Sequence, residues 1–239
     1  MSGHSKWAKI KRSKGAVDQE RGRLFQRIAK EIYVAVKNGD PNIDMNTSLK
    51  LVIEKAKGVN MPKDNIERAI EKAVGSAKDE NFESIRYEGY GPSGVAFIVD
   101  CLTDNKNRTA SMVRSAFTKR GGNLGTSGSV AYMFERIGLI VVPNDINEDE
   151  VMMCALDNGA IDFITNEDNY EIYTSTDDFM KVKEALVKLG VKEFLTTEVT
   201  LVANQKVALD EEHTQKALSL VELLEEIDDV QDVYHNLEE

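Results

Sequence analysis

The sequence has little of what a metal site, a disulfide framework or a membrane span would need. Its 239 residues include two cysteines, three histidines and one tryptophan. Cys101 and Cys154 are too few and too far apart for a disulfide framework or a zinc knuckle, and their apolar surroundings predict buried free thiols in a reducing compartment. No apolar run approaches the roughly 18 residues of a membrane span. The basic N-terminus lacks the apolar segment of a secretory signal, which favours a cytoplasmic protein.

Recognisable catalytic patterns are also missing. His4, His213 and His235 are scattered, without the spacing of a metal site. The glycine-rich stretch 121–128 lacks the Gly-Lys-Ser/Thr ending of a nucleotide-binding loop, so it indicates a flexible turn. No nucleophile elbow or triad-like string is present. The sequence therefore predicts a protein that is not an enzyme and that uses no cofactor or metal, with a metal-dependent nuclease acting through acidic residues as a remote alternative.

What the sequence does have is an uneven distribution of charge. The formal net charge is -11, yet residues 1–75 carry 16 Lys+Arg against 9 Asp+Glu, a net of +7. A second basic zone, residues 104–136, has six basic and two acidic residues, and residues 137–239 then carry a net charge of -19. A cationic end on an anionic chain favours a polyanionic ligand over a merely solvated tail. If the fold brings the two basic zones to one face, they could hold a polyanion between them, with the acidic residues 137–239 on the opposite side.

The N-terminal 78 residues are expected to form a basic tail and a small helical domain. Residues 1–17 lack hydrophobic periodicity and are expected to be mobile until they bind, and Trp7 offers a stacking face inside the basic run. Apolar spacings of three and four predict helices after the N-cap Asp18, over 47–57, and from Pro62 to Gly75. The third helix has nearly balanced charge, which argues against a major-groove recognition helix and favours backbone or shape recognition, as of structured RNA.

From residue 85 the hydrophobic period changes to two. Residues 85–90 and 95–102 predict a hairpin, followed by a helix from its cap Asn107 to Arg120 and a strand over 130–134. The N-terminus of this helix, flanked by Lys106 and Arg108, suits a phosphate.

Residues 137–195 show the β-α-β-β-α-β order of a ferredoxin-like domain, closed by a strand near 193–195. A strand at 198–207, a helix at 210–227 and a strand at 230–237 then match the β-α-β half of residues 95–134. The fold class is therefore α+β, an N-terminal three-helix domain followed by two ferredoxin-like α/β domains, one inserted in the other. The expected domains are 1–78, 79–136 plus 196–239, and the inserted unit 137–195.

Several strings of the sequence occur in the order known from one protein family. They are Gly3-His4-Ser5-Lys6-Trp7, Lys30-Glu31-Ile32-Tyr33-Val34-Ala35, the segment 59–70 beginning Val59-Asn60-Met61-Pro62, Tyr87-Glu88-Gly89-Tyr90-Gly91-Pro92, Asp104-Asn105-Lys106-Asn107-Arg108-Thr109, and Gly121-Gly122-Asn123-Leu124-Gly125. Over essentially its full length the chain resembles the YebC family, whose eukaryotic relatives are mitochondrial translational activators of a cytochrome oxidase subunit. The resemblance implies three domains, a helical one and two α/β ones. It also implies one of two functions: DNA-binding transcriptional regulation, or ribosome association that helps translation through proline-rich stretches.

The residues leave open whether DNA or ribosomal RNA is the partner. Lysine and arginine contacts to phosphate supply affinity without sequence information. The expected partner is therefore a nucleic acid, with the ribosome as a candidate assembly and no membrane. The residues expected to contact it are Lys6, Trp7, Lys9, Lys11, Arg12, Lys14, Arg21, Arg23, Arg27, Lys106, Arg108, Lys119 and Arg120.

Overall fold

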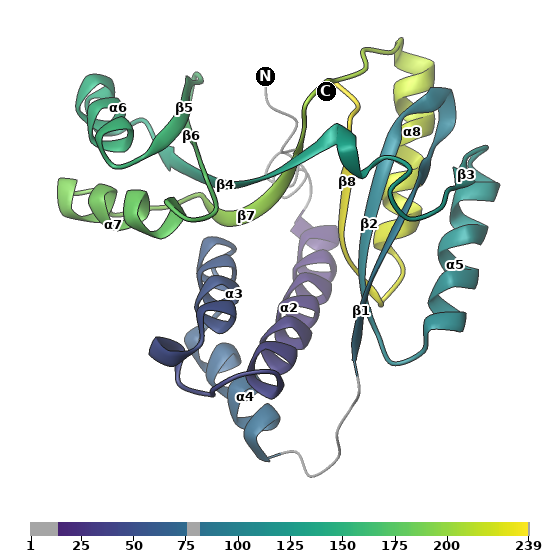
Figure 1. The fold of residues 1–239 in the computed structure, drawn as a ribbon, viewed down its shortest axis with the longest axis horizontal. Coiled ribbons are helices and arrows are strands. Elements are labelled where there is room, and N and C mark those ends of the chain that lie inside the picture. Colours follow the sequence, from purple (N-terminus) through teal and green to yellow (C-terminus); the bar gives the residue numbers. More distant parts are fainter. Residues whose placement is uncertain (1–13, 76–81, 239) are drawn as a thin grey trace. The chain divides into compact units, whose positions relative to one another are not determined.

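A computed structural model describes residues 14–75 and 82–238, with side chains from residue 21 onward (Figure 1). The predicted α+β class is confirmed, because helices fill the N-terminal region and two four-stranded sheets follow. The described residues fall into two compact units. Of the described residues, 14–34, 75, 82–135 and 202–238 belong to unit 1, and 35–74 and 136–201 belong to unit 2. The three-domain division expected from the sequence stays a prediction.

The N-terminal region contains α2 (Lys14–Lys37), α3 (Thr47–Gly58) and α4 (Lys63–Gly75). Asp18 is not the N-cap that the sequence suggested, because α2 is already helical at Lys14. The start of α3 is fixed by the buried Asn46, whose side-chain oxygen accepts a hydrogen bond from the backbone N–H of Leu49 at 3.0 Å. Its amide nitrogen donates to the carbonyl oxygens of Ala35 and Asp40, both at 2.8 Å. One side chain therefore caps α3 and holds the preceding loop.

The sheet of unit 1 has the order β3-β1-β2-β8, with antiparallel pairing throughout. Its strands are β1 (Glu83–Tyr90), β2 (Ala96–Thr103), β3 (Asn123–Leu124) and β8 (Val230–His235). The predicted hairpin is confirmed as β1 and β2, whose register runs from Glu83 opposite Thr103 to Tyr90 opposite Ala96.

Two helices, α5 (Lys106–Lys119) and α8 (Glu211–Glu225), pack on this sheet (Figure 1). Their apolar faces share one buried core with alternate residues of β2. Phe97 of β2 meets Phe117 of α5 edge to face, with ring centroids 5.9 Å apart, and Leu220 of α8 is fully buried in the same cluster. Burial of this apolar face fixes which side of α5 points outward.

The second sheet, with the order β5-β6-β4-β7, has the strand arrangement of a ferredoxin-like domain. Its elements are β4 (Phe134–Pro143), α6 (Glu148–Asp157), β5 (Ala160–Thr165), β6 (Asn169–Thr174), α7 (Phe179–Leu189) and β7 (Thr196–Ala203). Ile140 and Ile172 of the sheet are buried against Val151 of α6 and Leu186 of α7. Helix α3 joins unit 2 through Leu51 at the edge of this core and through an ion pair of Glu54 with Lys183.

Two element predictions are wrong. Residues 131–133, expected within a strand, form a 3-10 turn, and the short strand β3 at 123–124 completes that side of the sheet instead. Residues 193–195 form no strand, and the strand expected at 198–207 is β7, which runs from Thr196 to Ala203. The first error has a clear cause, because the backbone N–H groups of Val130 and Ala131 donate to the side chain of Glu88 and not to a neighbouring strand.

Candidate nucleic-acid interface

The basic tail lies outside the described residues. This applies to five of the residues expected to contact nucleic acid, Lys6, Trp7, Lys9, Lys11 and Arg12. Lys14 is the first residue of α2, and its side chain also lies outside the described set. The contacts expected of these six residues stay predictions.

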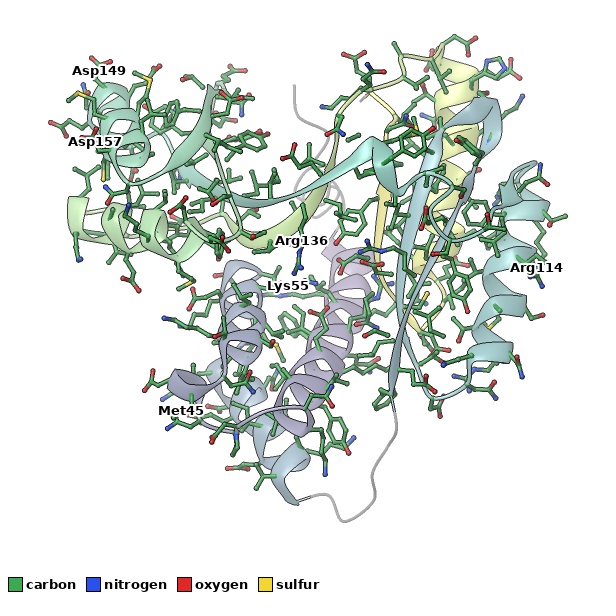
Figure 2. The ribbon with its side chains drawn as sticks, viewed as in Figure 1. Met45, Lys55, Arg114, Arg136, Asp149 and Asp157 are labelled. Carbon is green, nitrogen blue, oxygen red and sulfur yellow. The ribbon has the colours of Figure 1, made fainter. Side chains whose placement is uncertain are left out.

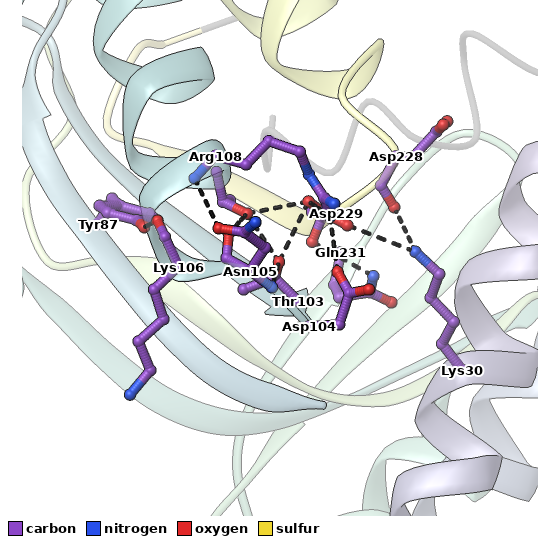
Figure 3. Close-up of polar contacts among 11 residues, drawn as sticks. Lys30, Tyr87, Thr103, Asp104, Asn105, Lys106, Arg108, Asp228, Asp229 and Gln231 are labelled. Atoms are coloured by element: carbon purple, nitrogen blue, oxygen red, sulfur yellow. Dashed lines mark hydrogen bonds and ion pairs between the residues drawn. The ribbon is translucent and has the colours of Figure 1, made fainter. Parts of the chain in front are cut away.

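Arg108 lies at the centre of a polar cluster inside unit 1 (Figure 3). Its guanidinium donates hydrogen bonds of 2.8 Å to the carboxylates of Asp104 and Asp229. Asp229, which precedes β8, is 6% exposed, and the hydroxyls of Thr109 and Thr103 hydrogen-bond to the same carboxylate oxygen at 2.9 and 3.2 Å. Arg108 therefore serves first as the partner of a buried anion, and its contact with nucleic acid stays a prediction.

The protonation of this cluster follows from its hydrogen bonds. Burial alone would raise the pKa of Asp229, but the hydrogen bonds from Arg108 and Thr109 and the nearby charge of Lys30 outweigh it and leave that pKa below its usual value. The same pairing raises the pKa of Arg108. The carboxylate is therefore ionised at neutral pH and holds β2, α5 and the start of β8 together.

Two basic residues of α2 donate to carbonyl oxygens at or just after the C-terminal end of α8. The Lys30 ammonium donates to the carbonyl oxygen of Asp228 at 2.9 Å and lies 3.8 Å from the Asp229 carboxylate (Figure 3). The Arg27 guanidinium donates to the carbonyl oxygen of Glu225, the last residue of α8. The C-terminus of a helix carries partial negative charge, so these cations stabilise it. Arg27, expected to bind nucleic acid, is thus used within the fold.

The other two arginines predicted on α2 differ from each other. The guanidinium carbon of Arg21 lies 5.4 Å from the centroid of the Phe25 ring, a cation–π distance. Arg23 is exposed and has no ion pair among the described residues. Of the cations on this helix, Arg23 is the better placed for a ligand.

At the N-terminus of α5, the capping residue is Asn105 and not Asn107, because the Asn105 side-chain oxygen accepts from the Arg108 N–H at 3.0 Å. The Thr103 hydroxyl in turn accepts from the Asn105 N–H at 2.9 Å and fixes this earlier start. Lys106 forms an exposed ion pair with Glu83. Carboxylates surround this helix end, so the phosphate that the sequence suggested would have to compete with them.

The C-terminal half of α5 and the residue after it provide cations that are exposed and not engaged in ion pairs. Arg114, Lys119 and Arg120 are exposed, and none has a carboxylate partner among the described residues. The segment from Lys106 to Phe134 contains no aspartate or glutamate, in a chain that has 41 of them. In Figure 2, Arg114 points from α5 away from the sheet. The predicted residues Lys119 and Arg120 thus lie, together with Arg114, in an acid-free stretch of the sequence, and we call these three exposed cations the basic surface.

The glycine-rich stretch after α5 follows a defined path around Glu88. The Glu88 carboxylate, 4% exposed, accepts hydrogen bonds from the N–H groups of Gly128, Val130 and Ala131 at 2.8 to 2.9 Å. Burial opposes ionisation, but the three donors keep the pKa of Glu88 below its usual value. Gly121 and Gly128 have φ values of +75° and +84°, which L side chains rarely adopt.

Sequence reasoning missed Asp229 and Glu88, the two carboxylates that shape this region. Glu88 lies inside one of the strings shared with the family, but no pattern marks it as an acceptor, and the two carboxylates bind donor groups about 40 to 126 residues away in the chain. The predicted basic residues divide accordingly. Arg27, Lys106 and Arg108 have partners within the protein, and Arg23, Lys119 and Arg120 remain exposed to solvent.

Residues 14–75 and 82–238 contain no group of three or more His, Cys, Asp or Glu side chains arranged to hold a metal ion. Within the same ranges, no helix is both long and apolar enough to cross a membrane.

Comparison with known proteins identifies relatives over the whole chain. Residues 5–76 match the family model "TACO1/YebC protein N-terminal domain", and residues 82–237 match "TACO1/YebC second and third domain". A protein of Geobacillus thermodenitrificans and one of Clostridium beijerinckii, each named "Probable transcriptional regulatory protein", are 52% identical to the chain. The matches cover all of this chain and 98% and 97% of those proteins. The crystal structure of a conserved hypothetical protein from Aquifex aeolicus has a TM-score of 0.83 and 47% identity, covering 97% of this chain and 96% of its own.

Proposed function

This chain belongs to the TACO1/YebC family, and from that membership and the geometry above we propose that it is a regulator of gene expression that binds nucleic acid and acts without catalysis. The names of its relatives support a regulatory role. The binding itself is argued from the basic surface of α5.

The observation that carries the proposal is the basic surface. Arg114, Lys119 and Arg120 are exposed, have no carboxylate partner among the described residues and lie in a segment without acids, in a protein whose net charge is -11. Exposed cations of this kind bind phosphates and release counterions, which gives affinity with little sequence preference. We therefore assign to this surface, together with the basic tail, the contact with the nucleic-acid backbone.

DNA-binding transcriptional regulation is the function that the family names suggest, and ribosomal RNA is the alternative partner. Two observations favour the alternative. The α4 helix offers no strongly basic face, since Lys63 is paired with Glu67 at 3.3 Å. Residues 137–239, with a net charge of -19, would be repelled by nucleic acid on every side, whereas a ribosome presents basic proteins beside its RNA.

The test compares two triple variants of the full chain that remove equal charge. Arg114→Gln/Lys119→Gln/Arg120→Gln neutralises the basic surface, and Lys181→Gln/Lys188→Gln/Lys192→Gln neutralises three exposed lysines of unit 2. Affinity for a DNA duplex and for a ribosomal RNA fragment is measured across a range of salt concentrations. Each lost phosphate contact should reduce the log–log salt slope by about 0.7 to 0.9 in the first variant only.

Equal slopes in both variants would contradict the assigned surface. A preference of about a thousandfold for one duplex over random DNA at physiological salt would favour transcription over the ribosome. Incubation of either nucleic acid with magnesium checks the absence of catalysis, and cleavage by the purified protein would overturn that part of the proposal.

A further inference from the structure

The outer side of α6 exposes two large apolar side chains. Val151 and Ala155 of this helix are buried in the core of unit 2, whereas Met153 is 62% exposed and Leu156 is 47% exposed. Met153 and Leu156 are three residues apart, so their side chains are neighbours on the surface of the helix. Burial of the opposite side keeps this pair in water, and exposed apolar surface with a polar rim is typical of a protein contact.

Three carboxylates lie on the same side of α6. Asp149 precedes Met153 by four residues, Asp157 follows it by four, and Glu150 precedes it by three, spacings that make them neighbours on a helix. Figure 2 shows Asp149 and Asp157 on this helix, which has them near its two ends. All three carboxylates are exposed, and none forms an ion pair among the described residues. We define the α6 face as Asp149, Glu150, Met153, Leu156 and Asp157.

This part of the sequence has no cations of its own. Residues 137–180 contain eleven Asp+Glu and no lysine, arginine or histidine, in a chain that has 30 Lys+Arg. Asp149 and Glu150, in the first turn of α6, stabilise the positive end of the helix dipole. Asp157, the last residue of α6, has the opposite effect, because the C-terminal end is negative and no basic residue lies in its last turn. A cation brought by a partner would therefore stabilise this end of the helix.

We propose that the α6 face is a docking surface for a cationic protein segment, which packs an apolar side chain against Met153 and Leu156 and pairs its lysines or arginines with the surrounding carboxylates. Apolar contact at the centre excludes water, and the charged rim orients the segment and accelerates its approach. Methionine suits such a contact, because its flexible thioether adapts to the shape of the partner. Nucleic acid does not fit this face, since its phosphates would meet carboxylates. The docking surface therefore goes beyond the proposed function and does not depend on it.

The probe is a fluorescent octapeptide of lysines with leucines at its third and sixth positions, and fluorescence anisotropy measures its affinity for the full chain. Two control peptides carry serines in place of both leucines, or glutamates in place of all the lysines. The leucine peptide should bind about tenfold more tightly than the serine peptide, because it alone buries apolar surface. The glutamate peptide should not bind, and added salt should weaken both lysine peptides by screening the rim.

Variants of the full chain locate the contact. Met153→Ser should weaken binding of the leucine peptide by about tenfold and leave that of the serine peptide unchanged. Asp149→Asn/Asp157→Asn should weaken both lysine peptides and reduce their dependence on salt. The matched control is Glu167→Gln/Asp168→Asn, which removes equal charge at exposed positions of the same cation-free segment but outside α6. The control should bind within about twofold of the wild type, because it alters only the long-range field.

Thermal unfolding separates an effect on binding from an effect on the fold. Asp157→Asn alone should weaken peptide binding while its Tm stays the same or rises, because the substitution removes a repulsion at the helix end. Equal weakening by the α6 double variant and the matched control, or equal affinity of the leucine and serine peptides, would overturn the docking surface. Self-association of the wild type that Met153→Ser abolishes would assign the α6 face to a second copy of this chain and overturn the cationic partner. Each of these outcomes leaves the proposed nucleic-acid binding untouched.

Discussion

The guanidinium of Arg108, in the first turn of α5, donates a 2.8 Å hydrogen bond to the buried carboxylate of Asp229, 121 residues further along the chain. Lys30 of α2 approaches the same carboxylate from another element. One anion therefore joins three segments that are remote in sequence, and the positive charges around it are committed to the fold. The basic residues of this protein consequently belong to two groups, those that hold unit 1 together and those that remain for a ligand.

Loss of the central carboxylate should destabilise the protein. Asp229→Ala leaves Arg108, Thr109 and Thr103 without their shared acceptor, and we expect a loss of about 2 kcal/mol in the free energy of unfolding. Urea unfolding followed by circular dichroism measures it. Asp228→Ala is the matched control, because Lys30 contacts only the backbone carbonyl of Asp228, which alanine retains. Equal destabilisation by both variants would argue against the cluster.

The contribution of Asp229 should depend on pH in a defined direction. Its pKa is lowered in the folded protein, so the unfolded chain takes up a proton at higher pH than the folded one. The stabilisation is therefore complete above the unfolded pKa of about 3.9 and is lost as the pH falls through the folded value. The stability difference between wild type and Asp229→Asn should be constant above about pH 5 and shrink below about pH 4. A difference that grew in acid would contradict this assignment.

Replacing Glu88 by glutamine should loosen the loop that it organises. Glutamine keeps one acceptor oxygen and replaces the other with an NH₂ group, so at least one of the N–H groups of Gly128, Val130 and Ala131 loses its acceptor. Amide hydrogen exchange at one or more of these three residues should accelerate by about tenfold or more, the equivalent of roughly 1.4 kcal/mol. Glu135→Gln, an exposed acid of the same region, serves as the control. Unchanged exchange in Glu88→Gln would show that the loop holds its shape by other contacts.

The two cysteines should react with thiol reagents at very different rates. Burial raises the pKa of Cys101 to about 12, and the half-buried Cys154 thiol has a pKa raised by the same cause to a lesser extent. At pH 8 the native protein should show one slowly reacting thiol, which disappears in Cys154→Ser, and the second should react only on unfolding. Rapid labelling of native Cys154→Ser would mean that the core around Cys101 opens readily.

The elements that sequence reasoning predicted correctly are those whose signal is local. Periodic apolar residues identified α3 and α8, alternation identified the β1–β2 hairpin, and the order of strands and helices identified the ferredoxin-like arrangement. The N-cap of α5 was predicted wrongly as Asn107, since an asparagine at 105 suits the position equally and the hydroxyl of Thr103, two residues earlier, selects Asn105.

What the sequence could not reveal is the pairing of charges across long separations. Lys106, Arg108 and Arg27 look like exposed cations in the sequence, and their partners Glu83, Asp229 and the carbonyl of Glu225 become apparent only in the folded chain. The strand expected at 130–134 failed for a similar reason, because the Glu88 side chain, about 40 residues earlier, takes the N–H groups that a strand would have shared. Charge tallies locate a basic segment but do not say which of its cations are already paired.

Glu88 has an electrostatic consequence that extends beyond its own loop. Three amide dipoles converge on its carboxylate and offset part of the field of this anion. The glycine-rich stretch thus carries a built-in counterpart of the phosphate that such loops bind elsewhere, and an incoming phosphate finds these three amides occupied. In the proposed function, a phosphate would therefore be attracted by the exposed charges of Lys119 and Arg120 and not by these amides.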